Sequence, residues 1–416
     1  MKHYLTKTAL LSTAALLAAG SATAQSSLTT DELLGQINTI TTAVPFLLIS
    51  PDSRAGGMGE VGVATSPDVN SIHWNASKLV FSDKKMGIGM SYTPWLRALV
   101  PDINLAYLSF YAKKGKNQAI GGSLRYFSLG NITFTDVVGN TIGQYKPNEF
   151  AIDVAYARRL SDRFSGGMAA RFIHSNLTGG INVQGADTKA GTSFAVDLSG
   201  TYRNDEIEVG GKKSDIAAGI NISNIGAKIS YSNTANKDFI PINLRLGTTL
   251  TTHMDEYNDL SFSLDLNKLL VPSPPKYLID STNGSPVIDP NTGKPMIEAG
   301  KDPDRSIASG MFGSFSDAPA GFREEMREIN ICTGMEYFYN KQFAVRAGYF
   351  YEHATKGNRQ FFTLGAGLRY NVFGLDFAYL IPTNRQRSPL ENTLRFTLTF
   401  DFDAFKSQNG DAGTTN

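Results

Sequence analysis

The feature that most constrains this chain is an alternation of apolar and polar side chains with a period of two residues. In the segment TLRFTLTFDF, Leu394, Phe396 and Leu398 share one parity, while Arg395 and Thr397 share the other. Successive side chains of a β-strand point to opposite faces, so this strand has one apolar face and one polar face. A strand of a soluble β-sandwich has the same pattern, so this segment alone leaves the fold class open.

The same alternation recurs in FAIDVAYARR, SFAVDLSGTY, LSFSLDLN, FAVRAGYFY and FGLDFAYL. Strands of about ten residues, with one apolar face and aromatic residues near their ends, are typical of a transmembrane β-barrel. The sequence therefore predicts an all-β transmembrane protein, a 14-stranded antiparallel outer-membrane β-barrel. The expected strands cover residues 86–96, 103–113, 118–129, 148–160, 163–176, 192–204, 214–225, 239–252, 259–269, 329–340, 342–353, 360–371, 373–381 and 392–402.

The connections between these strands alternate in length. Tight connections such as KKGKN, SDR, NK and NVFG alternate with long ones, and NDEIEVGGKK is a modest exception. Barrels of this class have short periplasmic turns and longer outer loops, so both termini are expected in the periplasm. The longest connection, residues 270–328, is rich in Pro, Gly, Ser and Asn, which predicts an exposed outer loop without regular structure. Such a loop is either a solvated spacer or a surface for a partner.

The ends of the chain complete the predicted organisation. Residues 1–24 contain two lysines, an apolar run and small residues before Gln25, a pattern typical of a secretory signal peptide cleaved after Ala24. Residues 25–85 are expected to form an N-terminal helix, with Leu33, Ile37, Ile40 and Val44 on one face, and a glycine-rich plug. The barrel then covers residues 86–402, and residues 403–416 form a C-terminal periplasmic tail.

Composition excludes several classes of protein. The net charge of +1 gives no reason to expect a nucleic-acid partner, and the single cysteine, Cys332, excludes an intrachain disulfide. After the signal peptide, no apolar run approaches the length of about 18 residues that a transmembrane helix needs. Cys332 itself is expected to be a small packing residue on a strand.

The segment GMGEVG matches the G-x-G-x-x-G spacing of a dinucleotide-binding turn at Gly57, Gly59 and Gly62. That motif binds phosphate only when a helix follows it, because the pyrophosphate sits on the N-terminus of the helix. The sequence after Gly62 is VATSPDVNS, which favours a turn around Pro67. We therefore expect no cofactor, and we expect the glycines to pass through a crowded space.

The fuller stretch RAGGMGEVGVATSPDVNSIHWNASKL resembles the N-terminal plug signature of the FadL-type outer-membrane β-barrel family. Its glycine-rich part leads to an aspartate and to Asn75-Ala76-Ser77, where the family has Asn-Pro-Ala, so the proline is missing. The stretch PFLLISPDSRAGGMGEVGVATSPD is more similar to one branch, PorV (LptO) of the type IX secretion system. The resemblance implies a plug segment inside the barrel, carried by the following residues: Arg54, Gly56, Gly57, Gly59, Gly62, Asp68 and Asn75. Arg54 is expected to pair with lumen carboxylates such as Asp153, Asp197 or Asp265.

This resemblance also implies a location and partners. The protein is expected to be integral to the outer membrane of a Gram-negative, Bacteroidetes-type cell and to have no enzymatic activity. It would bind cargo proteins by their C-terminal domain and pass them from the translocon SprA to the cell-surface attachment complex with the sortase PorU. The alternative is a FadL-like transporter of hydrophobic small molecules.

Charged residues of inward parity are expected to form a network that hydrates and stabilises the lumen. They are Asp153, Arg171, Asp197, Arg245, Asp265, Arg346, Arg369 and Arg395. No Ser-His-Asp spacing, HExxH or CxxC is present, and the five histidines show no metal-ligand spacing, which disfavours an esterase, a protease or a metal site.

The connection TPWLRALVP after the first strand is predicted to be an exposed apolar tip. Exposed large apolar side chains mark interfaces, so these residues are candidates for partner contact. The candidates are Trp95, Leu96, Leu99 and Val100. Anchoring in the membrane interface by an aromatic belt is the other interpretation of the same residues.

Overall fold

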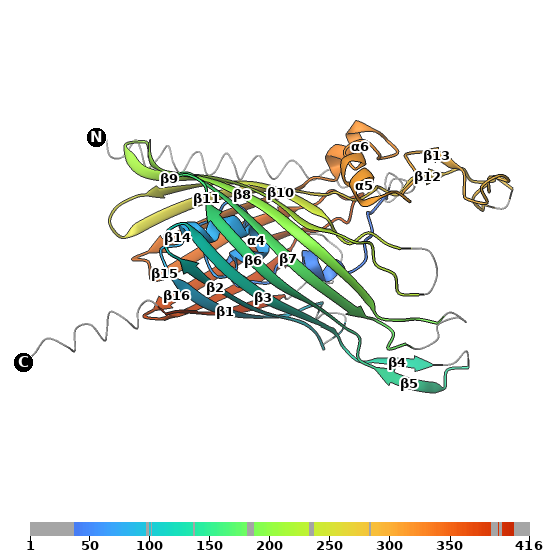
Figure 1. The fold of residues 1–416 in the computed structure, drawn as a ribbon, viewed down its shortest axis with the longest axis horizontal. Helices are drawn as coiled ribbons and strands as arrows, with labels where there is room; N and C mark the ends of the chain where they lie inside the picture. Colours follow the sequence, from blue (N-terminus) through green and yellow to red (C-terminus); the bar gives the residue numbers. More distant parts are fainter. Residues whose placement is uncertain are drawn as a thin grey trace, which may run out of the picture. The chain divides into compact units, whose positions relative to one another are not determined.

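Alternating strands close into a barrel in the computed structural model, which describes residues 37–96, 100, 102–135, 138–180, 187–232, 237–282, 284–383, 390 and 393–402. Fourteen antiparallel strands form the closed wall, in the order β1-β18-β17-β16-β15-β14-β11-β10-β9-β8-β7-β6-β3-β2 (Figure 1). Closure gives every strand a hydrogen-bonded neighbour on each side, as a β-structure in lipid requires. The predicted fold class is confirmed.

The strand bounds lie close to the ranges expected from the alternation. The barrel strands are β1 Met86–Pro94, β2 Ile103–Lys114, β3 Gln118–Leu129, β6 Asn148–Arg159, β7 Phe164–Asn176, β8 Gly191–Val209, β9 Lys212–Gly226, β10 Asn243–His253, β11 Asn258–Leu269, β14 Asn330–Tyr339, β15 Phe343–Tyr351, β16 Gln360–Tyr370, β17 Phe373–Pro382 and β18 Leu394–Asp401. The connection NDEIEVGGKK is not a loop: β8 and β9 extend through it as a hairpin that turns at Gly210 and Gly211, both with positive φ.

The wall is apolar outside and polar inside. On β6, Ile152 and Val154 are exposed, whereas Asp153 between them is buried. The same parity holds on β18, where Phe396 is exposed and Arg395 is buried. Exposed apolar side chains on a closed barrel face lipid, so the polar side chains point into the lumen.

The long connections all meet at one end of the barrel (Figure 1). They contain the hairpin of β4 (Ile132–Thr135) and β5 (Thr141–Tyr145), and the hairpin of β12 (Lys276–Tyr277) and β13 (Ile297–Ala299). Residues 270–328 also contain helices α5 (Ile307–Gly313) and α6 (Phe322–Arg327). The prediction that this connection lacks regular structure is therefore wrong. The short turns lie at the other, periplasmic end.

Residues 45–81 lie before β1 and form four short helical turns. These are η1 (Pro45–Leu48), α3 (Ser53–Gly56), α4 (Ser71–Trp74) and η2 (Ala76–Phe81). The helix expected to contain Leu33, Ile37, Ile40 and Val44 lies partly outside the described residues. Its described part, 37–44, is not helical, and Val44 has a left-handed φ of 47° immediately before Pro45.

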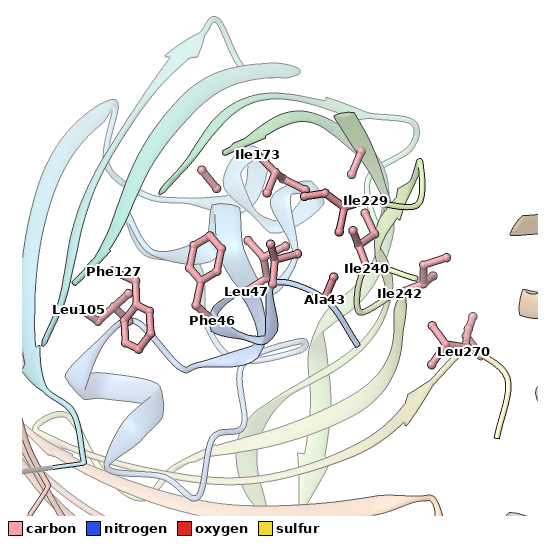
Figure 2. Close-up of a cluster of buried hydrophobic side chains, with 14 residues drawn as sticks. Ala43, Phe46, Leu47, Leu105, Phe127, Ile173, Ile229, Ile240, Ile242 and Leu270 are labelled. Carbon is pink, nitrogen blue, oxygen red and sulfur yellow. The ribbon is translucent and has the colours of Figure 1, made fainter. Parts of the chain in front are cut away.

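An apolar cluster at the outer end of the lumen surrounds η1. Phe46 and Leu47 extend from the N-terminal segment toward the inner faces of the strands, where Phe127 and Ile173 pack (Figure 2). The rings of Phe46 and Phe127 stack with their centroids 6.1 Å apart. This cluster holds residues 43–49 within the ring of strands. Among the described residues, no helix is long and apolar enough to cross a membrane.

Candidate functional site

The segment from Asp52 to Lys78 fills the barrel lumen and is held there by buried charges. Arg54 donates to Glu336 of β14 at 2.7 Å and to Asp68 at 3.0 Å. Glu336 also accepts from Arg346 of β15 at 2.6 Å. Arg54 does pair with a lumen carboxylate, as expected, but the partner is Glu336 and not Asp153, Asp197 or Asp265, because these aspartates bind other groups. Parity showed which strand residues face inward, but it did not show which of them lie at the depth of Arg54.

The three aspartates have two different roles. Arg171 of β7 bridges Asp153 of β6 at 2.5 Å and Asp197 of β8 at 3.0 Å, so these residues fasten adjacent strands. Asp265 of β11 instead accepts from the backbone N–H groups of Gly62 at 2.7 Å and Val63 at 3.0 Å. A buried carboxylate with two backbone donors fixes the path of the segment that supplies them. Asp265 therefore positions the chain immediately after the glycine motif.

The remaining arginines of the predicted lumen network also face inward. Arg346 and Arg369 both contact Asp376 of β17, at 2.8 and 2.7 Å. Arg395 of β18 donates to Glu60 at 2.8 Å. Arg245 of β10 has its guanidinium carbon 4.6 Å from the centre of the Trp74 ring. Arg395 and Arg245 therefore contact residues that precede β1.

The glycines of GMGEVG lie against strand backbones. Gly59 has a φ of +66°, and a Cβ atom there would lie 2.5 Å from the carbonyl oxygen of Thr333 and 2.6 Å from the amide nitrogen of Tyr349. A Cβ atom on Gly57 would lie 2.9 Å from the Cα of Gly365. Only glycine permits an approach this close, as the sequence predicts. At Gly56 and Gly62 an added Cβ would meet the side chains of Arg395 and Trp74.

Asn75 fixes the far end of this segment. Its side-chain amide donates to the carbonyl oxygen of Val63 at 2.9 Å and to the hydroxyl of Thr201 on β8 at 3.0 Å. Its side-chain oxygen accepts from the backbone N–H of Ser77 at 3.1 Å, so Asn75 caps η2. Lys78 donates to the carbonyl oxygen of Gly62 at 2.5 Å. The segment is thus tied to itself as well as to the wall. We call residues 52–78 the lumen segment.

Several residues of this network were not predicted from the sequence. They are Asp52, Glu60, Lys78, Glu336 and Asp376. For Glu336 and Asp376 a signal was present, because both have inward parity in MEYFY and FGLDFAYL. For Asp52, Glu60 and Lys78, which precede β1, the sequence contained no such signal, because no regular period relates that segment to the wall.

A cavity of about 350 Å³ lies above the lumen segment, at the outer mouth. Its apolar lining includes Ile40, Leu48, Trp95, Phe361 and Leu380, and its polar lining includes Glu60, Glu352 and Arg359. Trp95 and Leu96 are half-buried here, so they are not the exposed tip expected from the sequence. Val100 is exposed, and Leu99 lies outside the described residues.

The connection over residues 270–328 is fastened to the barrel by buried ion pairs. Lys268 at the end of β11 contacts Glu325 at 3.0 Å and Glu328 at 2.6 Å. Lys356, in the connection from β15 to β16, contacts Glu324 at 2.6 Å and Glu328 at 3.0 Å. We call residues 305–328 the cap. Within the cap, burial raises the pKa of Asp317 above its usual value, against the lowering effect of a backbone N–H donated by Ser273.

The described residues show no group of three or more histidine, cysteine, aspartate or glutamate side chains placed to hold a metal ion. Cys332 is fully buried on β14, and its sulfur accepts from the side-chain amide of Asn267 at 3.2 Å. It therefore packs in the lumen wall. The helix α3 that precedes Gly57 is one turn long, and Gly57–Gly62 contact strand backbones and Asp265, which leaves no space for a phosphate group at the motif.

A closed barrel with an apolar outer surface, a polar lumen and an internal segment before the first strand defines an integral β-barrel protein of the outer membrane. A family model described as "Type IX secretion system protein PorV" matches residues 33–276. The chain belongs to this PorV family, and it is therefore an outer-membrane component of type IX secretion.

Three solved structures illustrate what else the chain is similar to. The toluene transporter TbuX of Ralstonia pickettii is 11% identical, over 85% of this chain and 97% of its own, with a TM-score of 0.46. The toluene transporter TodX of P. putida is 12% identical, over 85% and 98%, with a TM-score of 0.46. A FadL homologue of Pseudomonas aeruginosa is 10% identical, over 88% and 99%, with a TM-score of 0.44. No curated protein matches the chain.

Proposed function

We propose that this protein binds type IX cargo proteins by their C-terminal domain at the outer end of the barrel. It receives them from the translocon SprA and passes them to the cell-surface attachment complex that contains the sortase PorU. Membership of the PorV family supports a role in type IX secretion, and the cargo-binding step is our proposal. The protein acts as a binding component and has no catalytic role.

The observation that carries this proposal is the folded part of the connection over residues 270–328, which lies at the outer end beyond the lumen segment. Arg54, Asp265 and Asn75 hold the lumen segment across the barrel, which favours the outer end over the lumen as the place where cargo binds. There, the long connection is folded and fastened by Lys268 and Lys356. A preformed surface binds more tightly than a flexible loop, because less conformational entropy is lost on binding.

The hairpin around β12 and β13 offers a test that leaves the barrel and the cap intact. Residues 279–295 are replaced by Asn-Gly, which forms a tight two-residue turn between Leu278 and Met296, whose backbones are already hydrogen-bonded. We expect cargo, SprA or PorU to be recovered in smaller amounts when the variant is purified from native outer membranes. Heat-modifiable migration of the barrel on gels should be unchanged.

A matched control shortens the other outer hairpin, that of β4 and β5, in the same way. If both variants recover cargo and partners as the wild type does, the outer hairpins are not the binding surface and the proposal is wrong in its location. If the wild-type protein itself recovers no cargo, SprA or PorU, the proposed role is wrong.

A second candidate function is transport of hydrophobic small molecules, as in a FadL-like transporter. The mouth cavity favours it, because Ile40, Leu48 and Phe361 give it an apolar lining. Transport also needs a path past the lumen segment, and the contacts of Gly57 and Gly59 with strand backbones leave none there. Uptake of a labelled hydrophobic compound into vesicles containing the protein would support transport, and its absence would favour the secretion role.

A further inference from the structure

The outer rim of the barrel has a band of aromatic side chains that does not go all the way round. Outward-facing aromatic residues lie near the outer ends of the strands from β15, through β18 and β1, to β8, except on β2, where Ala106 lies between Tyr92 and Tyr126. They are Tyr349, Phe362, Tyr379, Phe396, Tyr92, Tyr126, Phe150, Phe172 and Phe194, and most are direct cross-strand neighbours. Such aromatic belts mark the boundary between hydrocarbon and headgroups.

Four adjacent strands, β9, β10, β11 and β14, have no aromatic residue at this level. The outward residues at their outer ends are Ile222, Leu244, Lys268 and Ile331. Within the described part of the chain, the aromatic band is therefore interrupted over one sector of the wall.

The cap lies against the outside of the wall in this sector. Lys268 has the same outward parity as Leu264 and Leu266, which are exposed, yet Lys268 is buried. It is covered by Glu325 of α6 and by the ring of Phe315, whose centre lies 5.8 Å from its ammonium nitrogen. The next outward-facing pair of β10 and β11 toward the periplasm is Leu246 and Leu266, and both of these side chains are exposed to lipid. The cap thus ends where the lipid-facing surface begins.

The side chains on the other face of the cap are large, apolar and exposed. Phe312 of α5 and Phe322 of α6 each have 78% of their surface exposed, and Met326 has 51%. Phe322 and Met326 are four residues apart, so they share one face of α6, and the buried Glu324 lies on the opposite face. Exposure of this extent on a folded surface is characteristic of an interaction site.

We propose that the cap lies on the outer leaflet of the membrane, with Phe312, Phe322 and Met326 inserted at the boundary between acyl chains and headgroups. They complete the aromatic band in the sector where the strands have none. Continuity with the lipid-facing Leu246 and Leu266 favours lipid over a protein partner as the occupant. This inference does not depend on the proposed role in cargo transfer.

Tryptophan fluorescence in vesicles of phosphatidylcholine brominated at shallow acyl carbons tests the proposal. Phe322→Trp is compared with Phe362→Trp, which lies in the aromatic band, and with Ile288→Trp, in the exposed connection between β12 and β13. The native Trp74 and Trp95, measured in the unsubstituted protein, give the baseline. We expect bromine to quench the added fluorescence at residue 322 as strongly as at 362, and to leave that at 288 unchanged.

Quenching at residue 322 that is as weak as at 288 would overturn the proposal. That result is also expected if the natural occupant of this face is a protein partner. Met326→Trp provides a second position on the same helix face if Phe322→Trp does not fold. Folding of each variant is checked by its heat-modifiable migration on gels.

Discussion

Substitution of Gly59 by alanine provides a sharp test of how the lumen segment is held. The new Cβ atom would lie 2.5 Å from the carbonyl oxygen of Thr333 and 2.6 and 2.7 Å from the amide nitrogen and carbonyl oxygen of Tyr349. All three are backbone atoms of hydrogen-bonded strands, so they cannot rotate away. The residue also has a φ of +66°, which disfavours every side chain.

The magnitude follows from these two effects. A left-handed conformation costs an L-residue about 1–2 kcal/mol. Overpacking in a rigid interior typically adds about 1–3 kcal/mol. Docking of the segment around residue 59 should therefore weaken by about 2–5 kcal/mol, and 2 kcal/mol already corresponds to a change of about 30-fold in an equilibrium. The barrel itself should remain closed, because its strand ladders do not include Gly59.

Gly115→Ala is the matched control. Gly115 has a φ of +69°, but nothing lies within 4 Å of an added Cβ atom, so this variant tests the left-handed conformation without the clash. In planar bilayers, Gly59→Ala should show higher ion conductance and more frequent openings than Gly115→Ala or the wild type. Equal conductance in all three folded proteins would refute the argument that contact with the strand backbones seals the lumen.

Three further outcomes follow from other contacts. Arg54→Ala leaves Glu336 buried with Arg346 as its remaining charged partner, so the cost should be smaller than that of a fully unpaired buried charge, about 3–5 kcal/mol. Conductance should rise, and Arg54→Ala combined with Glu336→Gln should partly reverse the rise. Native protein should resist labelling of Cys332 by a maleimide, whereas unfolded protein should react; rapid native labelling would contradict its burial. Burial raises the pKa of Asp317, so its stabilising contribution is present at acidic pH and is lost as the pH rises through that pKa. Proteolysis of the cap in the wild type should therefore become faster as the pH rises. The same rise in pH should accelerate proteolysis less in Asp317→Asn.

The wall of the barrel could be predicted from the sequence because lipid and a polar lumen impose opposite requirements on alternate residues. The strand containing Asp153 illustrates this, since its exposed neighbours Ile152 and Val154 and its inward aspartate follow directly from parity. The β8–β9 hairpin was longer than expected, because its periplasmic end extends beyond the membrane, where polar residues such as those of NDEIEV replace the alternation.

Contacts between the wall and the rest of the chain could not be predicted in the same way. Parity places Glu336 and Asp265 on the inner face, but the choice of partner for Arg54 depends on the depth of each strand, which alternation does not specify. Lys268 has the parity of a lipid-facing residue and is nevertheless buried, because the cap covers it. Its partners lie more than fifty residues away in a segment whose composition suggested an unstructured loop.

The lumen segment contacts the barrel wall at the seam where the first and last strands meet. Ser53 donates its backbone N–H to the hydroxyl of Thr397 on the last strand, at 2.8 Å. That same hydroxyl lies 2.8 Å from the hydroxyl of Ser91 on the first strand. Ser53 of the lumen segment therefore bonds to the hydroxyl pair that crosses the seam between β1 and β18. Docking of the lumen segment and closure of the barrel should stabilise each other, because they share the hydroxyl of Thr397.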